Sequence, residues 1–248
     1  MSGKSRKIAL PGRAAEPAGF AEPVEPAERA EPAERGHPAK LAEPAEPAEP
    51  AEPGVELGVG ETGGPEGWLA KAVERVVEWA GQRGPSAGER RILAVEGRSG
   101  AGKTTLARAV ADRLAAPLIH MDDLYAGWDG LDEGVTNLRD WVLEPLAAGR
   151  PAAWRRWNWA AHAYAEEHPV PDAGWLVVEG VGAGARVLRP YLIGIVFLRS
   201  SPAVRKRRAL ARDGETYAPH WQRWAEHEDR FYATENVTAD LVIENEEH

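Results

Sequence analysis

The sequence predicts an α/β fold in which helices flank a parallel, doubly wound sheet and a short helix forms a lid. Three observations support this prediction. Apolar runs alternate with helical patterns from about residue 67 onward, these runs lack polar alternation, and the first of them ends at a glycine-rich loop. Strands that helices cover on both faces read as continuous apolar runs, and strands that alternate with helices favour parallel connections.

The folded part is expected to begin near Gly67 with an amphipathic helix over Trp68–Gln82. The apolar residues of this stretch recur at helical spacing: Leu69, Val73, Val76, Val77 and Ala80. Such residues share one face of a helix, and this face can pack on a sheet.

Strands and helices then alternate along the chain. Strands are expected at Arg91–Glu96, Pro117–Met121, Trp175–Val178, Tyr191–Leu198 and Asp240–Glu244. Helices are expected to carry Leu106, Val110 and Leu114 on one face, to form a shorter segment around Leu138–Val142, and to span Arg205–Arg212 and Trp221–Tyr232. Pro145 is expected to end or kink the shorter helix, because proline lacks the N–H that a helix interior needs.

Residues 1–66 are expected to form a disordered acidic tail, and residues 67–248 the folded domain. From about Ala15 to Pro53 the chain repeats Ala-Glu-Pro. A proline at every third position forbids a helix and leaves too little apolar surface for a core, so we interpret this segment as extended chain. A dispensable spacer is favoured over a docking segment, because composition alone rarely identifies a partner.

The net charge of −9 lies mainly in the tail, where 7 Lys and Arg stand against 13 Asp and Glu. The rest of the chain is nearly balanced, which argues against general nucleic-acid binding, since that needs a basic face. The chain has no cysteine and no long apolar stretch, so disulfides, thiolate metal sites and a membrane span are not expected. We therefore expect a cytoplasmic protein.

The loop that ends the first strand, residues 97–104, reads Gly-Arg-Ser-Gly-Ala-Gly-Lys-Thr and fits the P-loop pattern completely. Glycines let the backbone aim successive N–H groups at a triphosphate, and the following helix adds its positive N-terminal end. Lys103 can reach the β- and γ-phosphate oxygens, and the Thr104 hydroxyl can ligate Mg²⁺. The residues expected to bind the nucleotide are Gly97, Arg98, Ser99, Gly100, Ala101, Gly102, Lys103, Thr104 and Thr105.

Two aspartates, Asp122 and Asp123, follow the second strand. Ligands of an open α/β sheet sit beyond the carboxyl ends of its strands. A carboxylate at this position can lie opposite the γ-phosphate, take the proton of an acceptor hydroxyl and help hold the metal. Paired aspartates can also simply cap a turn. The location favours catalysis for one of the two, and the spacing leaves open which one.

Over residues 91–245 the chain resembles the uridine kinase family of P-loop kinases. Residues 122–125 (Asp-Asp-Leu-Tyr) match the family's Asp-x-(aromatic or apolar)-Tyr stretch. Residues 157–162 (Trp-Asn-Trp-Ala-Ala-His) are similar to its Tyr-Asp-Phe-x-x-His stretch, with the first three residues changed. The resemblance implies Asp122 as the base, Tyr125 beside the acceptor sugar, and Trp157 and His162 in the acceptor pocket.

Residues 177–180 (Val-Val-Glu-Gly) resemble the strand-end Glu-Gly of the same family. This likeness implies that Glu179 assists at the metal, directly or through water. The metal ligands expected are therefore Thr104, Asp122 and Glu179.

Residues 205–213 resemble the family's arginine-bearing lid helix. The resemblance implies Arg208 in catalysis together with Lys103, Arg212 at the nucleotide and Arg205 at the acceptor. Arginines on a closing lid can neutralise the transferring phosphoryl group and help exclude water. A solvated basic helix face would have the same pattern.

Tryptophans gather in the stretch expected near the acceptor, at Trp154, Trp157 and Trp159. An aromatic face can stack on a base or cover a sugar, although core packing is somewhat favoured for each of them. We interpret Trp221, Trp224 and Tyr232 as helix packing and not as a ligand site.

Together these motifs predict an ATP-dependent small-molecule kinase that uses Mg²⁺ and phosphorylates a hydroxyl of a nucleoside of the uridine or cytidine type. A different small-molecule acceptor, such as a sugar acid or a vitamin precursor, stays open, as does a non-catalytic ATP-binding protein. The expected partner is therefore a small-molecule acceptor, without nucleic acid or membrane. Self-association into a homo-oligomer is left open.

Overall fold

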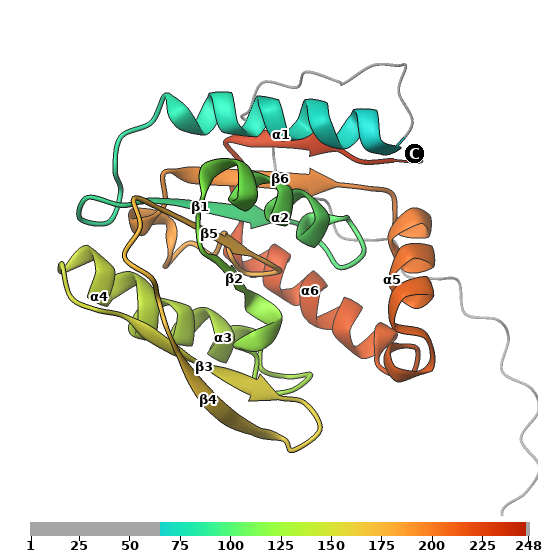
Figure 1. The fold of residues 1–248 in the computed structure, drawn as a ribbon. Coiled ribbons are helices and arrows are strands. Elements are labelled where there is room, and N and C mark those ends of the chain that lie inside the picture. Colours follow the sequence, from blue (N-terminus) through green and yellow to red (C-terminus); the bar gives the residue numbers. More distant parts are fainter. Residues whose placement is uncertain (1–64, 247–248) are drawn as a thin grey trace, which may run out of the picture. The chain divides into compact units, whose positions relative to one another are not determined.

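The computed structural model describes residues 65–246, apart from the side chains at positions 213 and 215–217. The predicted tail lies outside the described residues, except for its last two positions. Five strands form one parallel sheet in the order β2-β5-β1-β6-β7 (Figure 1). Their bounds are β1 Arg91–Glu96, β2 Leu118–His120, β5 Trp175–Glu179, β6 Gly194–Arg199 and β7 Leu241–Glu244. The predicted parallel, doubly wound sheet is confirmed.

Strand β1 lies at the centre of the sheet, with β5 on one side and β6 on the other. Its successive residues belong to two different cores: Leu93 and Val95 to one, Ile92 and Ala94 to the other. Side chains of a strand alternate between its two faces, and here both faces are covered by helices. This arrangement explains the continuous apolar run.

Helices α1 (Pro65–Gly81) and α2 (Lys103–Leu114) cover one face of the sheet (Figure 1). Helix α1 begins two residues before the predicted start of the fold. Its apolar stripe of Trp68, Ala72 and Val76 is buried in the same core as Leu93. The amphipathic pattern therefore turns toward the sheet as expected.

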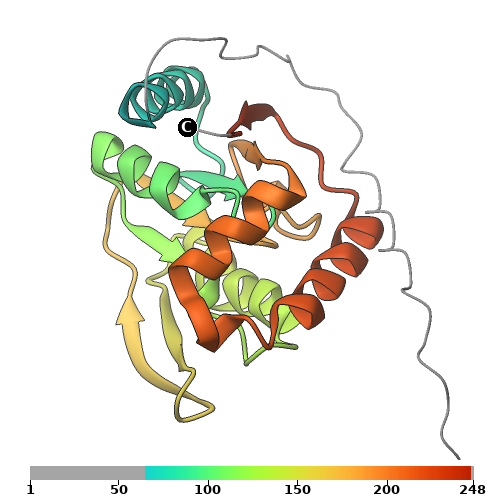
Figure 2. The same ribbon diagram turned by 90° about the vertical axis from the view of Figure 1, so that its right-hand side faces the viewer.

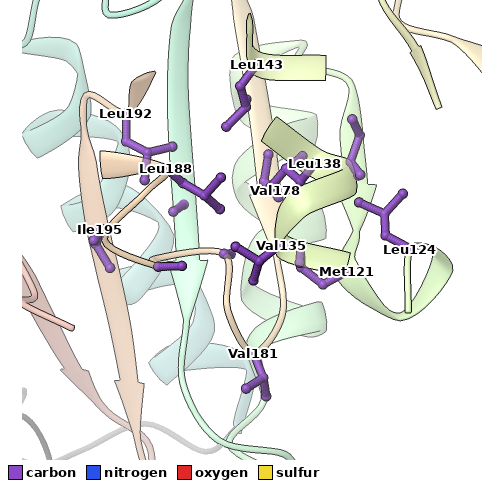
Figure 3. Close-up of a cluster of buried hydrophobic side chains, with 14 of the residues drawn as sticks. Met121, Leu124, Val135, Leu138, Leu143, Val178, Val181, Leu188, Leu192 and Ile195 are labelled. Atoms are coloured by element: carbon purple, nitrogen blue, oxygen red, sulfur yellow. The ribbon is translucent and has the colours of Figure 1, made fainter. Parts of the chain in front are cut away.

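A long helical segment and helix α6 (Trp221–Glu235) cover the other face. The segment consists of α3 (Leu131–Asn137), a π-helical turn (Leu138–Leu143) and α4 (Glu144–Ala147). Figure 3 shows its inward residues, among them Leu138, next to Val178 of β5. This core fixes the loop that follows β2.

The helix around Leu138–Val142 is longer than predicted, and Pro145 does not end it. The π-helical turn widens the helix just before the proline, so Pro145 lies in the first turn of α4. A missing N–H costs little at that position, because the first N–H groups of a helix have no intrahelical partner.

An antiparallel hairpin that the sequence analysis did not predict joins β3 (Ala153–Asn158) to β4 (Ala163–Pro169). Figure 1 shows it beside α3, apart from the main sheet. Its strands are only half buried, and their register shifts between Arg155 and Trp157. The shift disrupts the alternation by which a strand is recognised in a sequence.

Helix α5 (Pro202–Tyr217) lies beyond the carboxyl ends of the strands, where a lid helix was expected (Figures 1 and 2). Its backbone leaves the helical region at Gly214, where φ is 52° and ψ is −134°. Within residues 65–246, no helix is long and apolar enough to cross a bilayer.

Candidate active site

The glycine-rich loop leaves the end of β1 and enters α2 at the carboxyl edge of the sheet. Three of its glycines have positive φ angles: Gly97 at 137°, Gly100 at 82° and Gly102 at 98°. A Cβ atom at Gly100 would lie 2.2 Å from the backbone oxygen of Arg205. The curled loop therefore depends on glycine both for its dihedral angles and for the close approach of α5.

A cavity of about 900 Å³ opens in front of this loop. At one end it is lined by Ser99, Gly100, Gly102, Lys103, Thr104 and Thr105. The Lys103 side chain is buried, and its Nζ donates to the Arg98 carbonyl oxygen at 3.1 Å. A buried ammonium group beside backbone N–H groups at a helix N-terminus fits a polyphosphate.

Three side chains that the sequence placed at this loop are turned away from the cavity or sit behind it. Gly97 packs against the Leu198 backbone, Ala101 is fully buried, and Arg98 forms an ion pair of 2.6 Å with Asp229 of α6. None of the three lines the cavity. Arg98 therefore braces the loop from behind, where its guanidinium also lies over the Tyr232 ring.

A carboxylate, a hydroxyl and an imidazole meet next to the loop. Glu179, at the end of β5, accepts a hydrogen bond from Thr104 Oγ1 at 3.0 Å and pairs with His120 Nδ1 at 2.6 Å. Burial alone would raise the pKa of Glu179, but the hydrogen bonds from His120 and Thr104 and the charge of Lys103 lower it. The same hydrogen bond raises the pKa of His120. Glu179 is therefore held as a carboxylate.

Asp122 and Asp123 both line the cavity, just after β2. Asp122 is open to the cavity, and desolvation by the surrounding walls, followed by the charge of Glu179, raises its pKa. Lys103 and Arg212 act in the opposite direction on Asp122. Asp123 instead has charged neighbours on the hairpin, including Arg156, and desolvation raises its pKa too. The two carboxyl groups thus differ in the charges around them.

The three lid arginines do not share one environment. Arg208 and Arg212 line the cavity, whereas Arg205 is buried behind the loop, and its Nε donates to the Ser200 carbonyl oxygen at 3.2 Å. Arg208 is also held by the chain that follows β7, because its guanidinium donates to the Asn245 carbonyl oxygen at 2.9 Å. The structure therefore places Arg205 away from the acceptor.

Aromatic side chains form the other end of the cavity: Tyr125, Trp128, Trp159 and Trp224. Tyr125 is fully buried, and its hydroxyl donates to the Val181 carbonyl oxygen at 2.6 Å. Trp224 of α6, interpreted from the sequence as helix packing alone, is both packed and cavity-lining. Trp128 was not singled out in the sequence, although an aromatic residue in a glycine-rich turn after β2 is a signal that could have found it.

Two residues predicted in the acceptor pocket lie elsewhere. His162 is exposed at the turn of the hairpin, with a positive φ of 50°, and it does not line the cavity. Trp157 packs edge-on against Tyr164 at 5.0 Å and does not line the cavity either. Trp159, two residues further along, does line it, and its Nε1 donates to the Asp122 carbonyl oxygen at 3.2 Å.

Two late segments of the chain hold the loop from below. Glu228 of α6 is buried and accepts a hydrogen bond from the Ser99 N–H at 2.8 Å. Asn245, just after β7, donates its side-chain amide to the Ala101 carbonyl oxygen at 2.8 Å. The phosphate loop is thus shaped by its own glycines and by distant partners.

Glu96, the last residue of β1, is a fully buried carboxyl group. It accepts hydrogen bonds from the N–H groups of Gly97 and Gly184 and from the Tyr232 hydroxyl. Burial raises the pKa of Glu96 to about 7, although these hydrogen bonds and Lys103 oppose the shift. The folded protein therefore favours the protonated form more than the unfolded chain does.

This raised pKa predicts a pH-dependent stability. The folded state binds the proton of Glu96 more tightly than the unfolded state, so stability is lost as pH rises from the unfolded pKa through about 7. We expect the free energy of unfolding to fall by about 3 kcal/mol between about pH 5 and pH 8, relative to a Glu96→Gln variant. Denaturant unfolding of both proteins measures the difference, and a difference that stays constant with pH contradicts the prediction.

The oxygen atoms around Thr104 suit a small hard cation. The Thr104 hydroxyl touches the Glu179 carboxylate, and Asp122 lies near enough to feel its charge. Among the described residues, no group of three or more His, Cys, Asp or Glu could hold a metal by itself. Mg²⁺ commonly takes one or two carboxylates and completes its shell with water and phosphate oxygens, which fits this donor set.

Comparison with known proteins gives kinases. No protein-family model matches the chain. A cytidylate kinase from Pyrobaculum arsenaticum is 31% identical over 150 residues, which span 56% of this chain and 69% of that protein. A cytidylate kinase from Pyrobaculum islandicum is 30% identical over 138 residues, which span 51% of this chain and 62% of that protein.

Solved structures support the fold. A protein described as a possible uridine kinase, from Bacillus stearothermophilus, has a TM-score of 0.51 and 21% identity, and covers 71% of this chain and 98% of its own. A protein named as a candidate fructose transport system kinase, from Silicibacter sp. TM1040, has a TM-score of 0.53 and 19% identity, and covers 74% of this chain and 100% of its own. At these identities the likeness concerns the fold alone.

Proposed function

This chain belongs to the P-loop kinase family of its cytidylate kinase relatives and is a phosphotransferase, and from this premise we propose that it transfers the γ-phosphoryl group of Mg-ATP to a hydroxyl of a small, unphosphorylated acceptor. One observation carries the proposal: Lys103 of the phosphate loop and Asp122 after β2 line the same cavity. A triphosphate held by the loop would thus have a carboxylate opposite its end.

The donor end of the cavity is suited to bind and neutralise phosphate oxygens. The loop N–H groups and Lys103 would hold the β- and γ-phosphates. Arg208 and Arg212 line the cavity from α5 and would face the phosphoryl group in transfer. Positive charge held in place before the reaction stabilises the charge that spreads over that group in the transition state.

Asp122 is the residue that we assign as the base. In the proposed step the acceptor oxygen bonds to the γ-phosphorus, the bond from that phosphorus to the leaving ADP oxygen breaks, and the acceptor proton passes to the Asp122 carboxylate. Lys103, Glu179 and Arg212 all act on the charge of Asp122, which supports its position at the phosphate end. Asp123 feels hairpin charges instead and is not needed for this step. The raised pKa of Asp122 favours proton uptake.

Thr104, Glu179 and Asp122 are the residues that we expect to hold Mg²⁺. When bound, the ion would bridge the β- and γ-phosphate oxygens and neutralise part of their charge. His120 orients Glu179 through the 2.6 Å contact and is therefore a positioning residue.

A nucleoside is the first acceptor to test, because the stretch from Asp122 to Tyr125 matches that of uridine kinases and both residues line the cavity. A different alcohol is the second candidate. One observation favours it: His162 and Trp157, which the nucleoside assignment relied on, do not line the cavity.

A coupled assay of ADP release tests the function. The full chain with Mg-ATP is expected to release ADP slowly alone and at least about tenfold faster with its acceptor, since productive alignment requires the hydroxyl. Nucleosides, nucleoside monophosphates, sugars and amino alcohols would be compared at equal concentration. Preference for a monophosphate would contradict the proposed hydroxyl acceptor, and acceptor-independent turnover across all classes would contradict the kinase reaction.

A further inference from the structure

The acceptor end of the cavity has three indole walls, Trp128, Trp159 and Trp224, which we call the tryptophan box. Trp128 is the middle wall. Its ring meets Trp159 at a centroid distance of 4.9 Å and an angle of 55°, and it meets Trp224 at 6.1 Å and 75°. The rings are therefore adjoining walls that meet at an angle, and not the two parallel faces of a slot.

This arrangement distinguishes between kinds of ligand. A planar base gains most from rings that lie nearly parallel to it. A compact cation is attracted to the face of each ring, so several faces set at angles around it all contribute. Tilted walls thus favour a compact positive group over a flat base.

The polar atoms of two walls are already used within the protein. Trp159 Nε1 donates to the Asp122 carbonyl oxygen, and Trp224 Nε1 donates to Ser99 Oγ at 2.9 Å and to Glu228 at 3.0 Å. What these two indoles offer to a ligand is therefore their ring faces. Ring faces carry partial negative charge, which attracts cations.

The charged side chains at this end have the same preference. Asp123 lines the cavity and has no part in the proposed proton transfer. The cavity arginines come from the other side, Arg108 from α2 and Arg208 and Arg212 from α5. A phosphate group on the acceptor would meet a carboxylate here, whereas an ammonium group would be attracted to it.

We propose that the acceptor is an alcohol that also carries a positively charged amine, and that the tryptophan box and Asp123 bind this amine while its hydroxyl reaches Asp122. The inference rests on the proposed function, because it names the class of acceptor for that same reaction. It replaces a neutral nucleoside with an amino alcohol.

Matched pairs of probes test the charge alone. Choline and 3,3-dimethylbutan-1-ol have the same shape, as do protonated ethanolamine and propan-1-ol, and only the first of each pair is a cation. Binding to the full chain would be followed by tryptophan fluorescence, with a non-hydrolysable ATP analogue and Mg²⁺ present. We expect at least one cation to bind about tenfold more tightly than its neutral partner. Equal dissociation constants in both pairs, or no saturable binding of either cation, would overturn the proposal.

Variants locate the binding to the tryptophan box. Trp128→Leu keeps an apolar wall but removes the ring face, so the preference for the cation is expected to disappear while the ATP analogue still binds. Asp123→Asn is expected to weaken the cation about tenfold and to leave the neutral partner unchanged. The control is Trp154→Leu, because Trp154 stacks on His168 away from the cavity lining. If Trp154→Leu changed the preference as much as Trp128→Leu, the assignment to the box would be wrong.

The failure of this inference differs from the failure of the proposed function. Preferential cation binding without any acceptor-dependent release of ADP would keep the amine site and remove the kinase step. Acceptor-dependent release of ADP with a neutral alcohol preferred over its cationic partner would keep the kinase and overturn the amine site.

Discussion

Replacing Asp122 with asparagine is expected to lower kcat about 10²- to 10⁴-fold, the range that a positioned general base contributes. Asparagine keeps the size and the backbone contacts of the aspartate, including the carbonyl oxygen that accepts from Trp159 Nε1. It cannot take the acceptor proton. Binding of an ATP analogue is therefore expected to change little, and single-turnover transfer with the acceptor measures the loss.

Asp123→Asn is the matched control for this prediction. It makes the same chemical change on the neighbouring residue, which also lines the cavity. We expect it to raise KM for a cationic acceptor and to leave kcat within a fewfold of the native value. Near-native turnover in Asp122→Asn, or an equal loss of kcat in both variants, would remove Asp122 from its assigned role.

Replacing Lys103 with alanine is expected to weaken ATP binding about tenfold to a hundredfold, because hydrogen bonds to charged groups are worth about 1.5–3 kcal/mol. The ammonium group is buried among loop backbone groups, so water cannot easily take its place. Phosphoryl transfer should fall further, since the charge on the group in transfer also loses a partner. Equilibrium dialysis with ATP measures the affinity.

Lys71→Ala is the control, because Lys71 lies exposed on α1 and does not line the cavity. The same charge is removed there without touching the loop. Unchanged ATP affinity in Lys103→Ala would overturn the assignment of the loop as the triphosphate site. A loss of equal size in Lys71→Ala would show that net charge, and not the loop, controls binding.

The strands and the phosphate loop could be predicted because their signals are local. Strand β1 needs only a short apolar run, and its loop needs glycines at the positions where positive φ angles occur, such as Gly100. The hairpin was missed because its strands are half exposed and its register shifts at Trp157. Backbone geometry thus followed from the sequence wherever burial was complete on both faces.

The acceptor end could not be predicted, because its walls come from segments that lie far apart along the chain. Trp128 follows β2, Trp159 follows β3 and Trp224 belongs to α6. Helical spacing showed that Trp224 faces inward, but not that the space inside is a cavity. The same limit applies to Arg205, which is close in sequence to Arg208 and yet is buried behind the loop.

The partners that support the phosphate loop from below bear on the timing of protein synthesis. Glu228 and Asn245, which hold Ser99 and Ala101, are separated from them by 129 and 144 residues along the chain. A chain emerging from the ribosome exposes its glycine-rich turn long before either support has been translated. The nascent protein should therefore acquire nucleotide only after its closing helix and strand have docked, and nucleotide would not assist the earlier stages of its folding.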